Sequence, residues 1–174
     1  EEEEVTPPVG EPQYGGTLTH RLWWCSSGPT NWDGTAIGGL PGHSWGSPFR
    51  EHLWIGDIEK YGPRGSGEFH FKAWGGGVPD RYLKGVLAEN WEWATPLTLV
   101  INLRQGVMWT GNEHIGMESR EFTAYDAEFA MNHAWDAYLD QGKVELFDWI
   151  DSITATDRYT LVMELNEFYA GLMF

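Results

Sequence analysis

The chain has few basic residues, a single cysteine and no long apolar run, and each shortage excludes a class of protein. Its 174 residues contain 11 Lys and Arg against 26 Asp and Glu, a formal net charge of −15. Eleven dispersed cations cannot neutralise the phosphates of a nucleic acid or cover an anionic membrane. One cysteine, Cys25, excludes an internal disulfide and a thiolate zinc site. No stretch approaches the roughly 18 apolar residues of a membrane helix.

Core-forming residues, by contrast, are plentiful. Hydrophobic residues make up 41% of the chain, and 11 Trp, 7 Tyr and 8 Phe are present, which indicates a globular protein. The acidic charge is uneven, because residues 1–13 contain five acids, three prolines and no base, leaving −10 over the other 161 residues. We interpret residues 1–13 as an extended, flexible linker, since they have too few apolar groups to offset the entropy of ordering.

Hydrophobic periodicity predicts the regular elements. Alternation of apolar and polar residues predicts strands over residues 16–24, 97–103 and 159–165. The clearest helix covers 123–138, beginning with Thr123 and Asp126 in a capping-box-like arrangement, with an apolar face of Ala127, Ala130, Met131, Ala134 and Tyr138. A short helix is predicted within 47–58, with Phe49, Leu53 and Trp54 on one side. Residues 61–77 predict a hairpin or an irregular excursion. This mixture indicates an α+β or α/β unit.

Signals for catalysis or metal binding are weak. The sequence contains no HExxH, GxSxG or Walker motif, and its six histidines include no pair at ligand spacing on the predicted helix. One acidic group could hold a divalent cation through oxygen ligands: Glu113, His114, Glu118 and Glu121. An acidic loop before a helix is more simply a solvated approach that matches the helix dipole. We therefore predict no metal, no cofactor and no catalytic residue.

Tryptophan is the most informative residue type, because the indole combines a large apolar face with one N–H donor. Five tryptophans lie in the periodic region and are expected to pack in the core: Trp91, Trp93, Trp109, Trp135 and Trp149. Trp24, Trp32 and Trp45 differ, since they stand at the end of the first predicted strand or in the Gly- and Pro-rich loops after it. Loops of that kind commonly carry binding residues. For these three, ligand contact and core packing both remain open.

Three sequence blocks follow one another over residues 82–131. They are LAENWE at 87–92, LRQGVMW at 103–109 and TAYD at 123–126. In this order and spacing they resemble the signature of family 5 extracellular solute-binding proteins, the peptide- and nickel-binding receptors of ABC importers. Residues 150–165 are similar to the following hairpin of that family and residues 14–18 to its opening strand. Departures are Thr110-Gly111 where the family has Asp-Gly, a lengthened segment up to Phe122, and a poor match over 33–80.

The resemblance implies an α/β fold of the periplasmic-binding-protein-like type II class, present only in part. We expect a linker at 1–13, the first strand and loops of lobe I at 14–45, and a sheet-plus-helix subdomain of lobe I at 46–174. Family members are about three times longer, so the chain is expected to be an N-terminal part. Solute contacts are then expected from the loops after the first strand and, less directly, from residues 138–143. The first group consists of Trp24, Cys25, Ser26, Trp32, His43 and Trp45.

The function implied is that of a non-enzymatic receptor. It would capture a peptide or similar small solute and deliver it to ABC permease subunits in the membrane, acting as a monomer without nucleic acid. Its expected location is the periplasm or the extracellular face of the membrane, with a lipid anchor upstream of the acidic linker. One alternative is a carbohydrate-binding or glycoside-hydrolase module with exposed Trp platforms. A second is a structural interaction module, which rests only on solubility and acidity.

Overall fold

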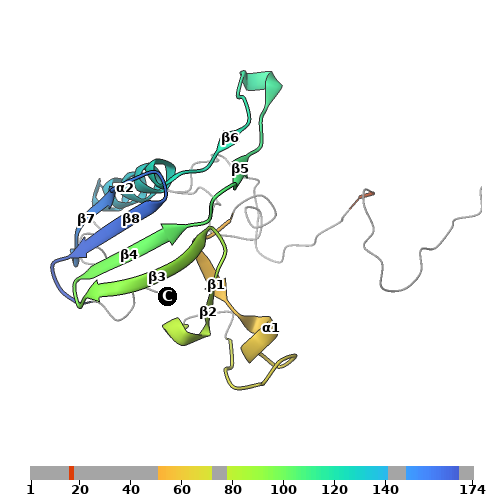
Figure 1. Cartoon of the computed structure of the whole chain (residues 1–174), viewed down its shortest axis with the longest axis vertical. Coiled ribbons are helices and arrows are strands. Elements are labelled where there is room, and N and C mark those ends of the chain that lie inside the picture. Colours follow the sequence, from red (N-terminus) through yellow and green to blue (C-terminus); the bar gives the residue numbers. More distant parts are fainter. Residues whose placement is uncertain (1–15, 18–50, 72–77, 141–147, 169–174) are drawn as a thin grey trace, which may run out of the picture.

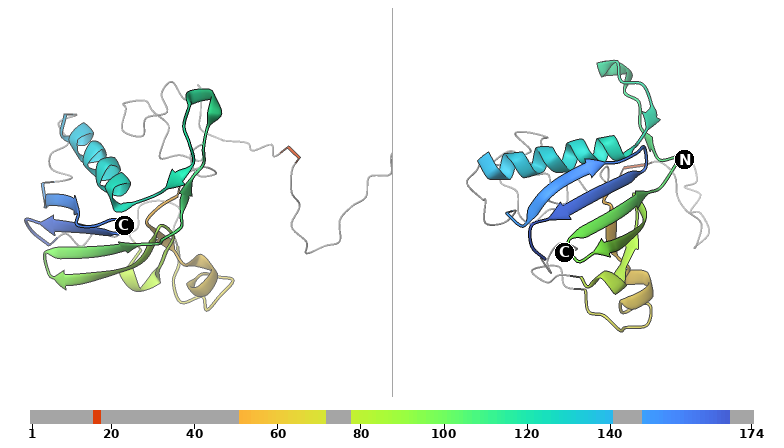
Figure 2. Two further views of the ribbon diagram at one scale, coloured as in Figure 1. Left: turned by 45° about the horizontal axis from the view of Figure 1, so that its top comes forward. Right: turned by 60° about the vertical axis from the view of Figure 1, so that its left-hand side comes forward.

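A four-stranded antiparallel sheet forms the centre of the computed structural model, which describes residues 16–17, 51–71, 78–140 and 148–168. Its strands lie in the order β3-β4-β8-β7. They are β3 (Ala88–Thr95), β4 (Thr98–Leu103), β7 (Ile150–Ala155) and β8 (Thr160–Leu165). The long helix α2 (Ala124–Asp140) covers one face over β7 and β8 (Figures 1 and 2).

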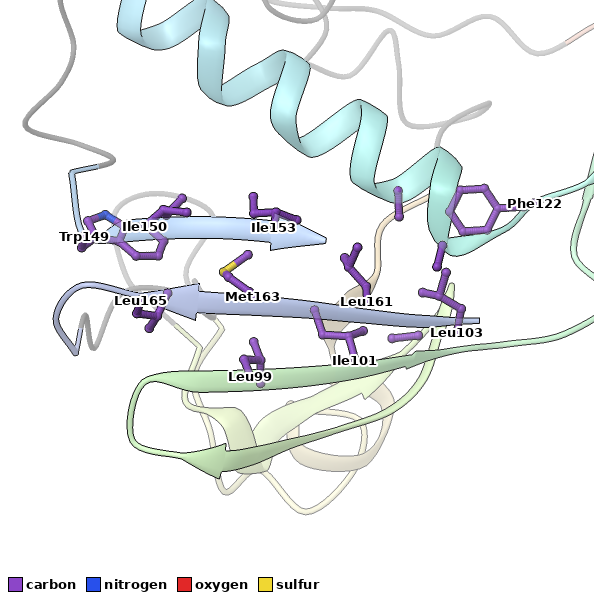
Figure 3. Packing of buried hydrophobic residues seen from close by; sticks show 13 residues of the cluster. Leu99, Ile101, Leu103, Phe122, Trp149, Ile150, Ile153, Leu161, Met163 and Leu165 are labelled. Carbon is purple, nitrogen blue, oxygen red and sulfur yellow. The ribbon is translucent and has the colours of Figure 1, made fainter. Parts of the chain in front are cut away.

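The two central strands have the predicted period-two burial. In β4 and β8 every second residue is buried, and the register places Leu99 opposite Met163 and Ile101 opposite Leu161. These side chains fill the space between the sheet and α2 (Figure 3). The residues of this core that are exposed by 2% or less are Ala88, Leu99, Ile101, Leu103, Ala124, Leu161 and Met163. Strands predicted at 97–103 and 159–165 are thus confirmed, each beginning one residue later.

The opposite face of the sheet is mostly polar, apart from Val100 and Val162, and carries cross-strand hydrogen bonds. The Thr98 hydroxyl donates to Glu164 Oε2 at 2.8 Å, and Asn102 Nδ2 donates to Asn90 Oδ1 at 2.7 Å. Opposed side chains of this kind stabilise antiparallel pairs without a second layer. The sheet therefore has one buried apolar face, and the side chains of its central strands on the other face are half-buried.

Helix α2 begins as the sequence predicts, but its buried face is rotated. Ala127 and Met131 face the core as expected, whereas Ala130 is exposed. Ala124 and Trp135 complete the buried stripe instead. The prediction was wrong at Ala130 because an alanine carries too small an apolar surface to decide which side of a helix is buried.

The short helix predicted within 47–58 is largely wrong for the residues described. Residues Trp54–Gly56 form strand β1, which pairs with β2 (Leu83–Gly85), and helix α1 covers only Ile58–Tyr61. The helix begins after Asp57, whose carboxylate accepts a hydrogen bond from the Lys60 N–H at 3.1 Å. Residues 62–71 are irregular, as expected, and the 3₁₀ turn η1 (Asp80–Tyr82) precedes β2.

The lengthened segment before α2 forms a projecting hairpin, here called the arm (residues 108–121). Its base pairs β5 (Met108–Trp109) with β6 (Arg120–Glu121), and the 3₁₀ turn η2 (Glu113–Ile115) forms its tip. In Figures 1 and 2 the arm extends away from both the sheet and α2. It follows a turn at Gly106, which has φ 76°.

Two further expectations concern residues that the structure describes only in part. The predicted strand at 16–24 lies outside the described residues except for 16 and 17. In the part of the chain that is described, no helix is long and apolar enough to cross a membrane.

The burial pattern of β8 gives a direct stability prediction. Leu161→Ala should lower the free energy of unfolding by about 3 kcal/mol, because it opens a cavity between sheet and helix. Val162→Ala, the next residue on the polar face, should cost about 1 kcal/mol or less. Urea unfolding followed by Trp fluorescence measures both, and equal losses would contradict this assignment of faces.

Candidate functional site

The residues predicted to contact solute lie outside the described part of the chain. This applies to Trp24, Cys25, Ser26, Trp32, His43 and Trp45. Of the weaker candidates at 138–143, residues 138–140 form the last turn of α2, and residues 141–143 lie outside the description. All of these assignments therefore stay predictions. The described residues that follow them in the chain begin with residue 51 and strand β1.

An aromatic cluster surrounds Tyr82, next to β1 and β2. The Tyr82 side chain is only 3% exposed, and Phe69 stacks on its ring with centroids 4.4 Å apart. Tyr61 meets the same ring edge-on at 5.1 Å, and Phe71 meets Phe69 at 4.8 Å. Gly56 allows close packing here, because a Cβ at this position would lie 2.5 Å from the Phe71 ring and that ring would have to shift. The cluster is thus a second small core that holds residues 51–71 against β2.

Polar groups at the rim of this cluster are already paired. The Tyr82 hydroxyl accepts a hydrogen bond from Arg81 at 2.8 Å and donates to Glu68 at 3.3 Å. Trp91 Nε1 donates to Asp80 Oδ1 at 2.5 Å, and the Trp91 ring lies 5.4 Å from that of Trp54. Side chains engaged in this way fix a scaffold. We therefore assign the Tyr82 cluster a positioning role.

A network of charged groups joins the arm to the sheet. Glu121 accepts hydrogen bonds from Arg158 at 2.8 Å, from the Gly106 N–H at 2.8 Å and from the Tyr159 hydroxyl at 3.0 Å. These three donors, with Arg158 contributing most, lower the pKa of Glu121. The carboxylate therefore ties together the turn after β4, the end of β6 and the turn between β7 and β8.

A second carboxylate fixes the start of α2. Arg120 donates two hydrogen bonds to Asp126, at 2.6 and 2.9 Å, while the Thr123 N–H and hydroxyl donate at 2.9 and 3.0 Å. Arg120 is the main cause, and together these donors lower the pKa of Asp126 to about 2. The predicted capping arrangement is confirmed, with Asp126 accepting from the backbone of the capping residue.

The acidic group considered as a cation site is not assembled. Glu121 is held at the base of the arm by Arg158, while Glu113 and His114 stand in η2 at the tip. Within the described ranges no three His, Cys, Asp or Glu side chains lie close enough to hold a metal ion. Trp109 also departs from its expected place in the core, since it is 41% exposed and touches Phe122 edge-on, with ring centroids 5.9 Å apart.

Comparison with known proteins identifies the scaffold. Residues 83–174, more than half of the chain, match the sequence pattern of the bacterial extracellular solute-binding proteins, family 5 Middle. The chain belongs to this family. Its fold is accordingly the mixed α/β, periplasmic-binding-protein-like fold expected from the sequence, present in part. The match covers β3, β4 and α2, the elements in which the three sequence blocks lie.

Solved structures of similar proteins extend far beyond this chain. MoaA from A. tumefaciens R10, in complex with mannopinic acid, is 24% identical with a TM-score of 0.43 over 53% of this chain. DppA from Helicobacter pylori, bound to the peptide STSA, is 24% identical with a TM-score of 0.39 over 52% of it. NikA from Brucella suis, with Fe(III)-EDTA, is 19% identical with a TM-score of 0.43 over 55% of it. The chain covers 18%, 19% and 18% of their respective lengths. No curated protein matches the chain.

The Asp126 network predicts a pH dependence. Because its pKa is about 2 in the folded protein and 3.8 in the reference state, its contribution is complete above about pH 4. That contribution is lost as the pH falls from about 4 to about 2. Asp126→Asn should therefore lower the free energy of unfolding at pH 7 by about 1–2 kcal/mol, given the partly exposed Arg120.

Urea unfolding at several pH values tests this expectation. The difference between wild type and Asp126→Asn should shrink toward zero as the pH approaches 2. Asp136→Asn, at an exposed position on the same helix, is the matched control and should change little at any pH. A difference between wild type and Asp126→Asn that is independent of pH would contradict the assignment.

Proposed function

We propose that this chain is the solute-binding component of an ABC importer, capturing a peptide or similar small solute for a membrane permease. The observation that carries the proposal is the family match over residues 83–174. Family 5 consists of solute-binding proteins, and binding followed by release needs no chemistry on the solute. We therefore propose that the protein is not an enzyme.

The described residues support a proposal in which the sheet and helix provide the scaffold and the loops bind the solute. The family blocks occupy strands β3 and β4, the Gly106 turn and the capped start of α2. Side chains of these blocks take part in hydrogen bonds within the scaffold at Asn90, Arg104 and Asp126. A rigid scaffold of this kind can hold loops in fixed positions for binding. In this proposal the indoles of Trp24, Trp32 and Trp45 stack on the solute, while Ser26 donates a hydrogen bond.

The proposal extends to location and partners. An importer receptor works outside the cytoplasm, and the acidic, Pro-containing residues 1–13 suit an extended linker between a lipid anchor and the folded part. The partner would be the permease of the same importer. The second lobe needed to enclose a solute would be supplied by the remainder of the full-length protein.

Intrinsic fluorescence of the full-length protein tests solute binding. Titration with di- and oligopeptides should shift the emission, while oligosaccharides should not. Trp32→Ala and Trp45→Ala should each weaken the affinity by about tenfold or more, because the peptide loses a stacking surface worth about 1–2 kcal/mol. Trp109→Ala, which removes an exposed indole on the arm, is the matched control and should leave the affinity unchanged.

Two outcomes would contradict the proposal. A response to oligosaccharides alone would favour the carbohydrate-binding alternative. Equal loss of affinity in Trp109→Ala and in the loop variants would remove the predicted loops as the site of contact.

A further inference from the structure

The outer face of helix α2 changes in chemistry along its length. Figure 2 shows one long side of the helix turned away from the sheet. Because a helix has 3.6 residues per turn, this side carries positions 125, 129 and 133 in its first half and positions 136 and 140 in its second. All five residues are exposed. The first three are Tyr125, Phe129 and His133, which carry rings, and the last two are Asp136 and Asp140.

The three rings, here called the aromatic stripe, lie next to one another. Tyr125 is 56% exposed and Phe129 is 73% exposed. The rings of Phe129 and His133 are parallel, with 2° between their planes and 5.9 Å between their centroids. Side chains four positions apart meet in this way on a helix surface. Among the described residues, neither Tyr125 nor Phe129 belongs to the core beneath α2, so the stripe is apolar surface that the sheet does not use.

Contact with water does not account for the aromatic stripe. The outer side of a surface helix normally carries polar residues, as α2 does at Asp136 and Asp140. The rings do not favour helix formation either, because aromatic residues have a lower helix propensity than Ala, Glu or Lys. An exposed apolar patch bordered by polar residues is typical of a surface that another part of an assembly covers. The two carboxylates then indicate where such a cover ends, because burying an unpaired charge is costly.

Family membership indicates what could cover the stripe. Residues 83–174 match the pattern of the Middle region of the family. The chain covers 18%, 19% and 18% of the lengths of MoaA, DppA and NikA, so most of each of those proteins has no counterpart here. A further part of the same polypeptide is held nearby by its covalent connection. It can therefore cover an apolar stripe without the entropic cost that a separate partner pays.

Charge disfavours the two other candidate occupants. A second copy of the chain carries the same net charge of −15, and a symmetric contact through this face would bring Asp136 and Asp140 close to the same residues of the other copy. An anionic lipid surface would repel the same carboxylates. The stripe therefore fits an apolar surface within the same protein better than either of these.

We propose that the aromatic stripe of α2 is an interface inside the full-length protein, covered by an apolar surface from outside residues 1–174. In this assignment Tyr125 and Phe129 are buried against that surface, while Asp136 and Asp140 stay in solvent at its edge. The inference goes beyond the proposed function, because it depends on the family of the chain and not on the solute or the permease. It gives α2 two packed faces, of which the first is the contact with β7 and β8.

Site-specific photo-crosslinking of the purified full-length protein identifies what covers the stripe. The protein would carry p-benzoylphenylalanine in place of Phe129, which keeps an aromatic side chain, or in place of Asp136 as the matched control on the same face. We expect an intramolecular cross-link from position 129 to a peptide outside residues 1–174, identified by mass spectrometry, and little cross-linking from position 136. The assignment would be overturned by a cross-link that stays within residues 1–174, by one that joins two copies, or by equal yields from the two positions.

Thiol accessibility is a second test that introduces no bulky group. In a full-length protein without other cysteines, Phe129→Cys should react with a maleimide about tenfold or more slowly than Asp136→Cys, because burial limits access to the thiol. The two variants should react at similar rates in urea, which controls for intrinsic reactivity. Similar rates in the native protein would show that the stripe is uncovered and would contradict the proposal.

Discussion

The pairing of β4 with β8 is the contact on which the rest of the described structure depends. It joins residues about sixty positions apart, with Leu99 opposite Met163 and Ile101 opposite Leu161. Everything between the two strands, including the arm, α2 and β7, is a closed excursion from this pair. The dry face of the pair receives the helix, and its far end supports the Arg158 and Tyr159 groups that bind Glu121. The scaffold and the arm therefore both depend on the pairing of β4 with β8.

Elements with a strong local signal could be predicted from the sequence. Strict alternation identified β4 and β8, and the Thr123–Asp126 cap located the start of α2. Strand β1 could not be predicted, because its three residues gain stability from pairing with β2, about thirty positions later. The helical spacing of Phe49, Leu53 and Trp54 suited a helix equally well. Pairing with a distant strand overrode that local pattern.

The candidate site could be predicted from the sequence only in part. The tryptophan-rich residues 24–45 have no periodicity, so the sequence could predict a binding role for them only through their position and the family resemblance. The extra length before Phe122 could be seen in the sequence, but no pattern within it predicted a projecting arm. Trp109 illustrates the reason, because an indole beside a strand end can either enter the core or cover its edge. Here Arg120 and Phe122 hold it at the edge.

The closed base of the arm has an evolutionary consequence. Because the Phe122 N–H meets the Val107 carbonyl directly, the two ends of the arm are fixed regardless of what lies between them. Residues can be inserted or deleted at the tip without shifting the register of β4 or the start of α2, and the entropic cost of a longer excursion grows only slowly with its length. The length and sequence of the arm can therefore vary among family members while the sheet and α2 keep their structure.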